Sequence, residues 1–522
     1  ASGGTEPPPP PPVTVTKAEA VQLLNQGGFG AVEGDTEQVI ALGLEGWIDN
    51  QMQKPVSLQL PHVQSVPPPQ FMFQLQEDWV DIWFRNVVNG DDQLRQRVAF
   101  ALSEILVVSQ LGALAQAPYA LADYYDVLAR NAFGNYRTLL EEVTLHPAMG
   151  VYLSMLGNEK PNPVLNIRPD ENYARELMQL FSIGLVELNL DGTEKLDTFG
   201  EPIPTYDQAI IEGFAHVYTG WTWANSPSFE QARGTPVTQV VPMELWPAYH
   251  DTGEKRLLNG VILPAGQSGE QDLSDALDNI FEHPNVGPFI ATRLIQRLVT
   301  SNPSPGYIRR VASAFNNNGS GIRGDLGAVI KAILLDPEAR PDMAMEIDGK
   351  LKEPLLRLTQ LFRAYNATSN SGRFPLVASY ILFGQGPLQS PSVFNFFSPF
   401  YAPPGEIRDS GLVAPELGIA TEYQNTLFTN YMFGQVFGLN QTSQSLGDDD
   451  VYIDFSEEML IAADADALID LVAEKLLGGQ MSDTLRNEIK GMLALIPETD
   501  TAIRAAETIY FVVTSPEFAY QR

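Results

Sequence analysis

The chain has 522 residues, with 64 acidic against 32 basic side chains, a net charge of −32 and no cysteine. This charge disfavours nucleic acid and anionic membrane surfaces as partners, because both need a basic footprint. The lack of cysteine excludes disulfides, thiolate zinc sites and cysteine nucleophiles. The 44% hydrophobic content indicates a folded core, and no apolar stretch reaches the roughly 20 residues that a membrane-spanning helix needs.

Residues 1–16 form an expected proline-rich tether, with six consecutive prolines at 7–12. Polyproline is stiff and extended, and it has no internal hydrogen bonds. The small residues at the start resemble the mature end of an exported or surface-anchored protein. We therefore expect an extracellular, cell-surface or periplasmic protein held by a tether, with self-association or other secreted proteins as candidate partnerships.

Helical periodicity dominates the first two thirds of the chain. Two short helices are expected within 17–50, separated by the glycine-rich turn 26–31, and a core helix within 95–110. A helix or a pair of helices is expected within 131–158, interrupted near His146-Pro147. The pattern predicts a mainly α protein: one large multi-helix domain, or two helical lobes, with long irregular insertions and minor β-hairpins.

The segment around 170–184 concentrates ionisable side chains at the start of an expected helix. Asp170 is the expected N-cap and Gly184 lies where the helix should end. Glu171 and Arg175 are four residues apart with the acid first, the better order for a helical ion pair. This helix therefore combines an apolar stripe with a polar first turn.

Glu176 projects at the edge of the apolar stripe of this helix. A carboxylate there must find a partner or shift its pKa, since unpaired burial is costly. We expect Glu176 to be buried and satisfied by a basic or hydrogen-bonding partner, as a functional acid or as part of a structural network. Its neighbours Tyr173 and Arg175 are candidate binders of an anionic or polyhydroxylated substrate.

The next segment, 188–208, is rich in turns, and a hairpin is expected around Asp191. Three side chains of this excursion are candidate ligands of a divalent cation such as calcium, although their spacing departs from the EF-hand pattern: Asn189, Asp191 and Asp197. No metal site is assigned on this basis, and the cofactor stays open.

A capping box at Thr205 and Gln208 predicts a helix that runs through Tyr218. His216 falls almost opposite the apolar face of that helix and four residues after Glu212. This spacing favours a solvated pair, so His216 is not a candidate ligand.

An irregular insertion with short strand-like runs is expected at 224–270. Long loops of this kind are often functional, and a loop histidine near acids suits a general base or a metal ligand. His250 is therefore a candidate catalytic residue with Asp251 as its orienting partner; in the alternative, His250 only anchors the loop.

Aromatic rings in or beside the insertion are candidates for stacking on a sugar, with core packing as the alternative: Trp221, Trp223 and Trp246.

The rest of the chain returns to helices after an aromatic and proline-rich stretch. Helices are expected at 456–477, 482–496 and about 500–513. The expected organisation is thus a tether, a helical core, a loop region and a C-terminal helical segment that packs on the core: 1–16, 17–366, 367–450 and 451–522.

Several blocks of the sequence carry a family resemblance. They are DENYARELMQLFSIGLVELNLDGT (170–193), HDTGEK (250–255), HPNVGPFIATRLIQRLVTSNPSPGYI (283–308), NNNGSGIRGDLGAVIKAILLDPEAR (316–340), GKLKEPLLRL (349–358), QSPSVFNFFSPFYAPP (389–404) and TSPEFAYQR (514–522). Over about residues 17–522 the chain resembles the bacterial family known as domain of unknown function 1800. The resemblance implies a mostly helical, exported bacterial protein with no agreed activity.

Two hypotheses for the function remain open. The sequence lacks the GxSxG, HExxH, P-loop and GxGxxG motifs. In the first hypothesis, an exported enzyme acts on an extracellular polymer or on a polyhydroxylated or anionic substrate, with Glu176, His250 and Asp251 in a pocket between the 170–184 helix and the 246–255 loop. In the second, the protein is a non-catalytic surface or extracellular scaffold whose polar cluster is a buried structural network.

Overall fold

The computed structural model describes residues 14–67, 72–340, 349–438 and 447–521. This part of the chain is built from α-helices and three small antiparallel sheets of two strands each. The expected mainly α class is therefore confirmed. The expected tether lies almost entirely outside the described residues. In the described ranges, no helix is both long and apolar enough to cross a membrane.

The two longest connections between the helices lie before and after α10. The first eleven are α1 Lys17–Gly27, α2 Asp35–Met52, α3 Leu60–Ser65, α4 Met72–Asn89, α5 Gln93–Ser103, α6 Pro118–Arg130, α7 Tyr136–Leu145, α8 Pro147–Tyr152, α9 Asn172–Gln179, α10 Gln208–Val217 and α11 Gly269–Phe281. The others are α12 Val286–Leu298, α13 Pro305–Asn316, α14 Leu326–Leu334, α15 Pro354–Ala364, α16 Ser379–Phe383, α17 Glu406–Asp409, α18 Glu422–Phe433, α19 Ser456–Ile461, α20 Ala465–Leu477, α21 Asp483–Leu493, α22 Thr501–Val513 and α23 Pro516–Ala519.

The strands are only two residues long and each pairs with one partner. The three pairs are β1 Trp221–Thr222 with β2 Glu244–Leu245, β3 Lys255–Arg256 with β4 Ile262–Leu263, and β5 Lys350–Leu351 with β6 Tyr520–Gln521. The first two pairs lie in or beside the expected irregular insertion. The third was not expected, and it fastens the end of the chain to the segment that precedes α15.

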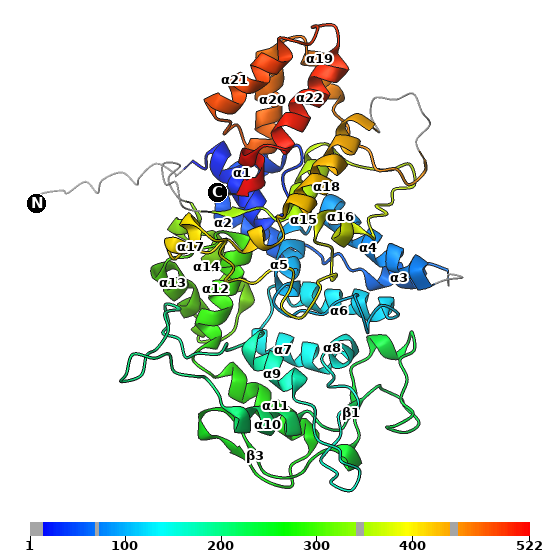
Figure 1. Cartoon of the computed structure of the whole chain (residues 1–522), viewed down its shortest axis with the longest axis vertical. Coiled ribbons are helices and arrows are strands. Elements are labelled where there is room, and N and C mark those ends of the chain that lie inside the picture. Colours follow the sequence, from blue (N-terminus) through cyan, green and yellow to red (C-terminus); the bar gives the residue numbers. More distant parts are fainter. Residues whose placement is uncertain (1–13, 68–71, 341–348, 439–446, 522) are drawn as a thin grey trace, which may run out of the picture.

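The molecule is elongated (Figure 1). Helices α19 to α22 stand at one end, α10 and α11 lie at the other, and α5, α6, α12 and α15 lie between them. The buried hydrophobic side chains form one continuous cluster that runs from Ala20 in α1 to Phe518 in α23. Helix α20 contacts α15 and so joins the C-terminal helices to the rest of the molecule.

Helix α9 is much shorter than the helix expected at 170–184. Asp170 accepts a hydrogen bond from the Asn172 amide at 2.8 Å, but the residue at the N-cap is Glu171, without a side-chain cap. After α9 the backbone makes a wider turn, in which the amide of Gly184 (φ +75°) donates to the Met178 carbonyl at 2.9 Å. Glycine suits this left-handed position, but α9 itself ends at Gln179 with Leu180 as its C-cap, so the predicted end of the helix at Gly184 is wrong.

The helix that follows is capped differently from the prediction. Asp207 is the N-cap of α10, and its carboxylate accepts from the Ile210 amide at 3.0 Å. The hydroxyl of Thr205 instead donates to the carbonyl of Gly184 at 2.6 Å. The expected helix at 456–477 is likewise two helices, α19 and α20, because Asp464 caps a new start.

Six charged side chains meet in the interior, where α5, α12 and the β5–α15 segment come together. We call this set the central charge network, and all its members are buried: Arg97, Glu104, Arg297, Lys350, Glu353 and Glu416. Lys350 is its centre. Its ammonium lies 3.0 Å from Glu416 Oε1 and 3.3 Å from Glu353 Oε1, and it donates to the carbonyls of Gln296 and Arg297 at 3.0 and 2.9 Å.

Glu104 and Glu353 are neighbouring acids of this network, and their pKa values shift in opposite directions. Burial raises the pKa of Glu104 to about 8, and the neighbouring Glu353 carboxylate adds to this rise. Burial also opposes ionisation of Glu353, but Lys350, Arg297 and Arg97 together bring its pKa down to about 2. At neutral pH Glu104 is therefore mostly protonated, whereas Glu353 carries the charge that balances the cations.

We predict that Glu104→Gln gains stability relative to the wild type as the pH rises. The pKa of Glu104 in the folded protein lies above its ordinary value. Its contribution to the free energy of unfolding is therefore complete below about pH 4.5 and is lost as the pH rises through about 8. Glutamine imitates the protonated acid and does not titrate. Urea unfolding between about pH 5 and pH 8 should show the wild-type free energy of unfolding falling relative to that of the variant.

The matched variant is Glu353→Gln, which removes the ionised acid beside Lys350. It should lose roughly 3–5 kcal/mol at about pH 7, the usual cost of breaking a buried ion pair from one side. Parallel pH profiles for the wild type and Glu104→Gln would contradict the assignment of the proton.

Candidate functional site

The polar side chains of α9 pack into the fold or pair at the surface. Tyr173 is buried: its hydroxyl lies 2.7 Å from Thr144 Oγ1, and its ring meets that of Tyr218 edge to face at 5.0 Å. Arg175 Nη2 lies 2.9 Å from Glu171 Oε2, which confirms the expected ion pair. Tyr173 is thus a packing residue, which leaves Arg175 as the partly exposed one of the two candidate binders.

Glu176 is buried as expected, with 7% of its surface exposed. Its Oε2 atom has no hydrogen-bond partner in the part of the chain that the structure describes. The expectation that a partner satisfies this oxygen is therefore wrong. Burial raises the pKa of Glu176, and the nearby Arg175 offsets only part of the rise. The carboxyl therefore stands in an apolar setting that favours its protonated form.

His250 is locked into the interior by two elements. Its Nε2 lies 2.9 Å from Asp272 Oδ2 on α11, and its Nδ1 lies 2.9 Å from the Thr219 carbonyl oxygen. Lys255 Nζ lies 2.7 Å from the same Asp272 oxygen. With all three side chains buried, the arrangement matches the alternative in which His250 anchors the loop to the helical body.

Asp251 pairs with His216, a contact that the sequence reasoning missed. The carboxylate accepts from His216 Nδ1, and this hydrogen bond lowers the pKa of Asp251 to about 2. The side chains of His216 and Asp251 are 31% and 19% exposed. The spacing of residues along a helix predicts contacts within that helix only, which is why His216 was expected to be solvated. Its partner, Asp251, comes from a loop 35 residues later.

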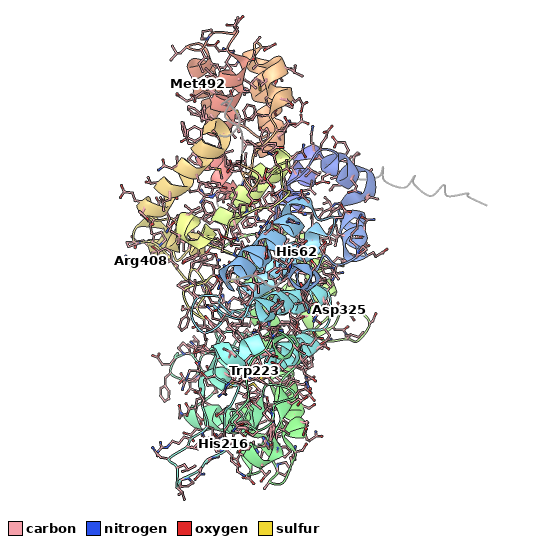
Figure 2. All side chains as sticks on the ribbon, turned by 90° about the vertical axis from the view of Figure 1, so that its right-hand side faces the viewer. His62, His216, Trp223, Asp325, Arg408 and Met492 are labelled. Carbon is pink, nitrogen blue, oxygen red and sulfur yellow. The ribbon has the colours of Figure 1, made fainter. Side chains whose placement is uncertain are left out.

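In the described residues, no direct polar contact links the candidate residues of the pocket expected between α9 and the 246–255 loop. Among the described residues, no hydrogen bond or ion pair joins Glu176 to His250 or to Asp251. Trp221 and Trp223 are buried, 4% and 9% exposed, so their faces are not open for stacking on a sugar. The third ring of that group, Trp246, is partly exposed. Figure 2 shows His216 and Trp223 in the half of the molecule opposite Met492 of α21.

The candidate calcium ligands build turns. Asp191 Oδ1 accepts from the amide and hydroxyl of Thr193 at 3.1 and 2.6 Å, and Asp191 Oδ2 lies 2.9 Å from Arg309. Asp197 accepts from two amides of its own turn, and Asn189 donates to Thr193 Oγ1. Over the described ranges, no three His, Asp or Glu side chains are placed to hold a metal ion.

A cavity of about 490 Å³ lies elsewhere, between α1, α20 and the C-terminal segment. We call it the α1–β6 cavity. In Figure 1 the C-terminus lies beside α1, well above α9 and α10 along the long axis. Its lining combines polar and apolar side chains: Thr16, Ala18, Glu19, Gln22, Asn25, Arg340, Lys352, Leu476, Leu477, Gln480, Pro516, Glu517, Tyr520 and Gln521.

Lys352 is a buried lysine in the wall of this cavity, 4% exposed. Its Nζ donates to Gln360 Oε1 at 2.6 Å and lies 4.2 Å from the centre of the Phe518 ring. No carboxylate of the described residues lies within ion-pair distance of it. Burial, together with the positive charge of Arg357, lowers the pKa of Lys352 to about 7.

Arg340 is the second cation of the α1–β6 cavity. Its Nη1 donates to Gln26 Oε1 and to the Ala339 carbonyl. The buried Nε and Nη2 atoms find no acceptor in the described part of the chain, and burial lowers the pKa of Arg340 to about 10. Both atoms are closed to solvent, so a carboxylate or phosphate would accept from this pair of N–H groups after the guanidinium turns toward the cavity.

The two acids of the cavity wall already have donors. Glu19 Oε2 accepts from the amide and hydroxyl of Thr16 at 2.8 and 2.7 Å. Glu517 Oε2 accepts from the Ser482 amide at 3.0 Å. Neither acid forms an ion pair with Arg340 or Lys352 in the described structure, although the charge of Glu19 acts on Arg340 and raises its pKa, partly offsetting the effect of burial.

We predict that Glu176→Gln does not destabilise the protein. Since folding raises the pKa of Glu176, the contribution of this carboxyl to the free energy of unfolding is complete below its ordinary pKa and is lost as the pH rises. At about pH 7 the variant should unfold at the same or a higher temperature, with a gain on the order of 1 kcal/mol, because a buried charge is removed. The gain should shrink near pH 4.

Glu171→Gln is the control for this change, since it removes a surface carboxylate of the same helix that is paired with Arg175. It should shift stability by less than about 1 kcal/mol. Calorimetric melting of both variants is the measurement. A loss of several kcal/mol for Glu176→Gln would mean that the carboxylate has a partner after all.

The comparisons with known proteins agree with the resemblance seen in the sequence. The model of a protein family of unknown function, DUF1800, matches residues 22–520. No curated protein and no solved structure matches the chain. The match includes α9 and most of the residues that line the α1–β6 cavity, and it covers nearly the whole length. The chain therefore belongs to the family of proteins of unknown function DUF1800.

Proposed function

We propose that the protein binds a small polyhydroxylated anion in the α1–β6 cavity. The observation that carries the proposal is the pair of cations in its wall, since the partly exposed Arg340 keeps two buried donors without acceptors and the buried Lys352 has no carboxylate partner among the described residues. Buried charge without a partner is costly, and a bound anion would remove that cost.

The geometry of the cavity supports this class of ligand. Its volume of about 490 Å³ falls in the range typical of small-molecule sites. A guanidinium binds carboxylate or phosphate through two parallel hydrogen bonds. Uncharged polar side chains of the wall, among them Gln22, Asn25 and Gln480, suit the hydroxyl groups of a sugar acid.

The proposed ligand belongs to the substrate class expected from the sequence, but its proposed site is the α1–β6 cavity rather than the pocket expected beside α9. In the described residues, Glu176 forms no hydrogen bond or ion pair with His250 or Asp251, and we place the ligand in the α1–β6 cavity instead. The scaffold alternative keeps one specific observation in its favour: the His250–Asp272–Lys255 cluster is a buried network that fixes packing. A scaffold of this kind would show no saturable binding of a small anion.

We further propose that the protein acts outside the cytoplasm. The proline-rich stretch at 7–12 and the strongly acidic composition support this location. Immunodetection in the fractions of the native cell is the test. Finding the protein in the cytoplasmic fraction alone would contradict it.

We predict that the protein binds D-gluconate and that Arg340→Met weakens this binding at least tenfold. Loss of a charge-assisted hydrogen bond costs roughly 1.5–3 kcal/mol, and methionine keeps much of the length of the side chain. Isothermal titration calorimetry with the full chain is the measurement. Arg233→Met, which removes a guanidinium from an exposed loop, is the matched control and should bind like the wild type.

Two outcomes would overturn the proposal. One is the absence of measurable heat with D-gluconate, D-glucuronate and inorganic phosphate alike. The other is equal affinity of the wild type and a folded Arg340→Met variant, which would place any anion elsewhere on the protein.

A further inference from the structure

The α1–β6 cavity contains an amine whose surroundings differ from those of the other buried lysines. This inference rests on the proposed function, because it concerns the ligand of the same cavity. We infer that Lys352 is a nucleophile that forms a reversible imine with the carbonyl carbon of an anionic sugar acid held by Arg340. The ligand class is thereby narrowed to acids that also carry an aldehyde or a ketone, such as uronic acids.

The comparison with other lysines carries the first step. Lys350 is as buried as Lys352, but it lies within 3.3 Å of two carboxylates, Glu353 and Glu416. Lys255 is also buried and lies 2.7 Å from Asp272. Lys352, in contrast, has one amide oxygen as its acceptor and no acid within ion-pair distance in the described ranges.

The second step concerns the charge state of this amine. An ammonium is normally stabilised by water or by a carboxylate, and burial without either favours the neutral form. The positive charge of Arg357 repels a second positive charge, in agreement with the lowered pKa of Lys352. Lysines desolvated beside another cation are the ones that enzymes use as amine nucleophiles.

The third step is the placement of the two cations. Arg340 and Lys352 line the same cavity, which has room for a small ligand. An anionic group on the Arg340 donors would hold the ligand while its carbonyl faces the amine. Gln360 Oε1 accepts a proton of the amine at 2.6 Å, and this contact orients the nitrogen.

The reaction is a condensation without oxidation or reduction. The nitrogen lone pair adds to the carbonyl carbon, a C–N bond forms, and the carbonyl oxygen takes up a proton to become a hydroxyl group. Loss of this hydroxyl with a second proton releases one water and leaves the C=N bond. The two protons come from the neutral amine, so the atoms balance.

The test is reductive trapping with D-glucuronate and cyanoborohydride on the full chain at about pH 7. Peptide mass spectrometry should find an addition equal to glucuronate less one oxygen atom on Lys352. Labelling should fall when D-gluconate, which has the anion and the hydroxyls but no carbonyl, is added in excess. Lys350 should stay unlabelled, and the exposed Lys17 should label much more slowly.

Two variants separate the chemistry from binding. Lys352→Met and Lys352→Arg should lose the adduct; the arginine keeps the positive charge if the methionine variant fails to fold. Saturable binding of D-gluconate without an adduct on Lys352 would overturn the imine and leave the proposed function standing. Failure of D-gluconate and D-glucuronate to bind at all would overturn both. Equal labelling of Lys17 and Lys352 would show non-specific glycation and would also overturn the inference.

Discussion

The ammonium of Lys350, held in the interior by two carboxylates and two backbone carbonyls, is the contact on which the rest of the structure depends. It joins α12, the β5–α15 segment and the loop that carries Glu416. The same short segment then supplies Lys352 to the α1–β6 cavity, and its pairing with β6 brings the end of the chain to the cavity wall. Lys350 and Lys352 are two residues apart on this segment. A change in the central charge network would therefore shift the backbone that carries Lys352.

Both buried polar systems contain groups without a hydrogen-bond partner in the described residues: Arg97 Nε and Nη1, Arg297 Nε and Glu104 Oε2 in the central charge network, and Arg340 Nε and Nη2 in the cavity wall. In the central charge network, Lys350 has four acceptors, and one acid, Glu104, avoids an uncompensated charge by keeping its proton. In the cavity wall, Lys352 and Arg340 are only partly satisfied. Groups kept at a cost to stability are typical of binding sites. We place the ligand in the cavity because its cations line a space of about 490 Å³.

Local sequence patterns were enough to predict much of the fold. The helices α1 and α2 with their glycine-rich turn, and α7 and α8 with their break at Pro147, follow from periodicity and turn residues that act over a few positions. The burial of Glu176 also follows from its place on the helix. The β5–β6 pair, the His216–Asp251 pair and the site at Lys352 do not, because each joins residues far apart in the sequence. Charge and spacing along one helix contain no signal for a partner that arrives from a distant loop.

A crystal structure of the full chain grown with D-gluconate would test the central claim most directly. The account predicts the carboxylate of the ligand in the α1–β6 cavity, with both of its oxygens within hydrogen-bond distance of the Arg340 guanidinium and its hydroxyls on the polar wall. A ligand bound at α9 or beside the His216–Asp251 pair, with the α1–β6 cavity free of ligand, would contradict it.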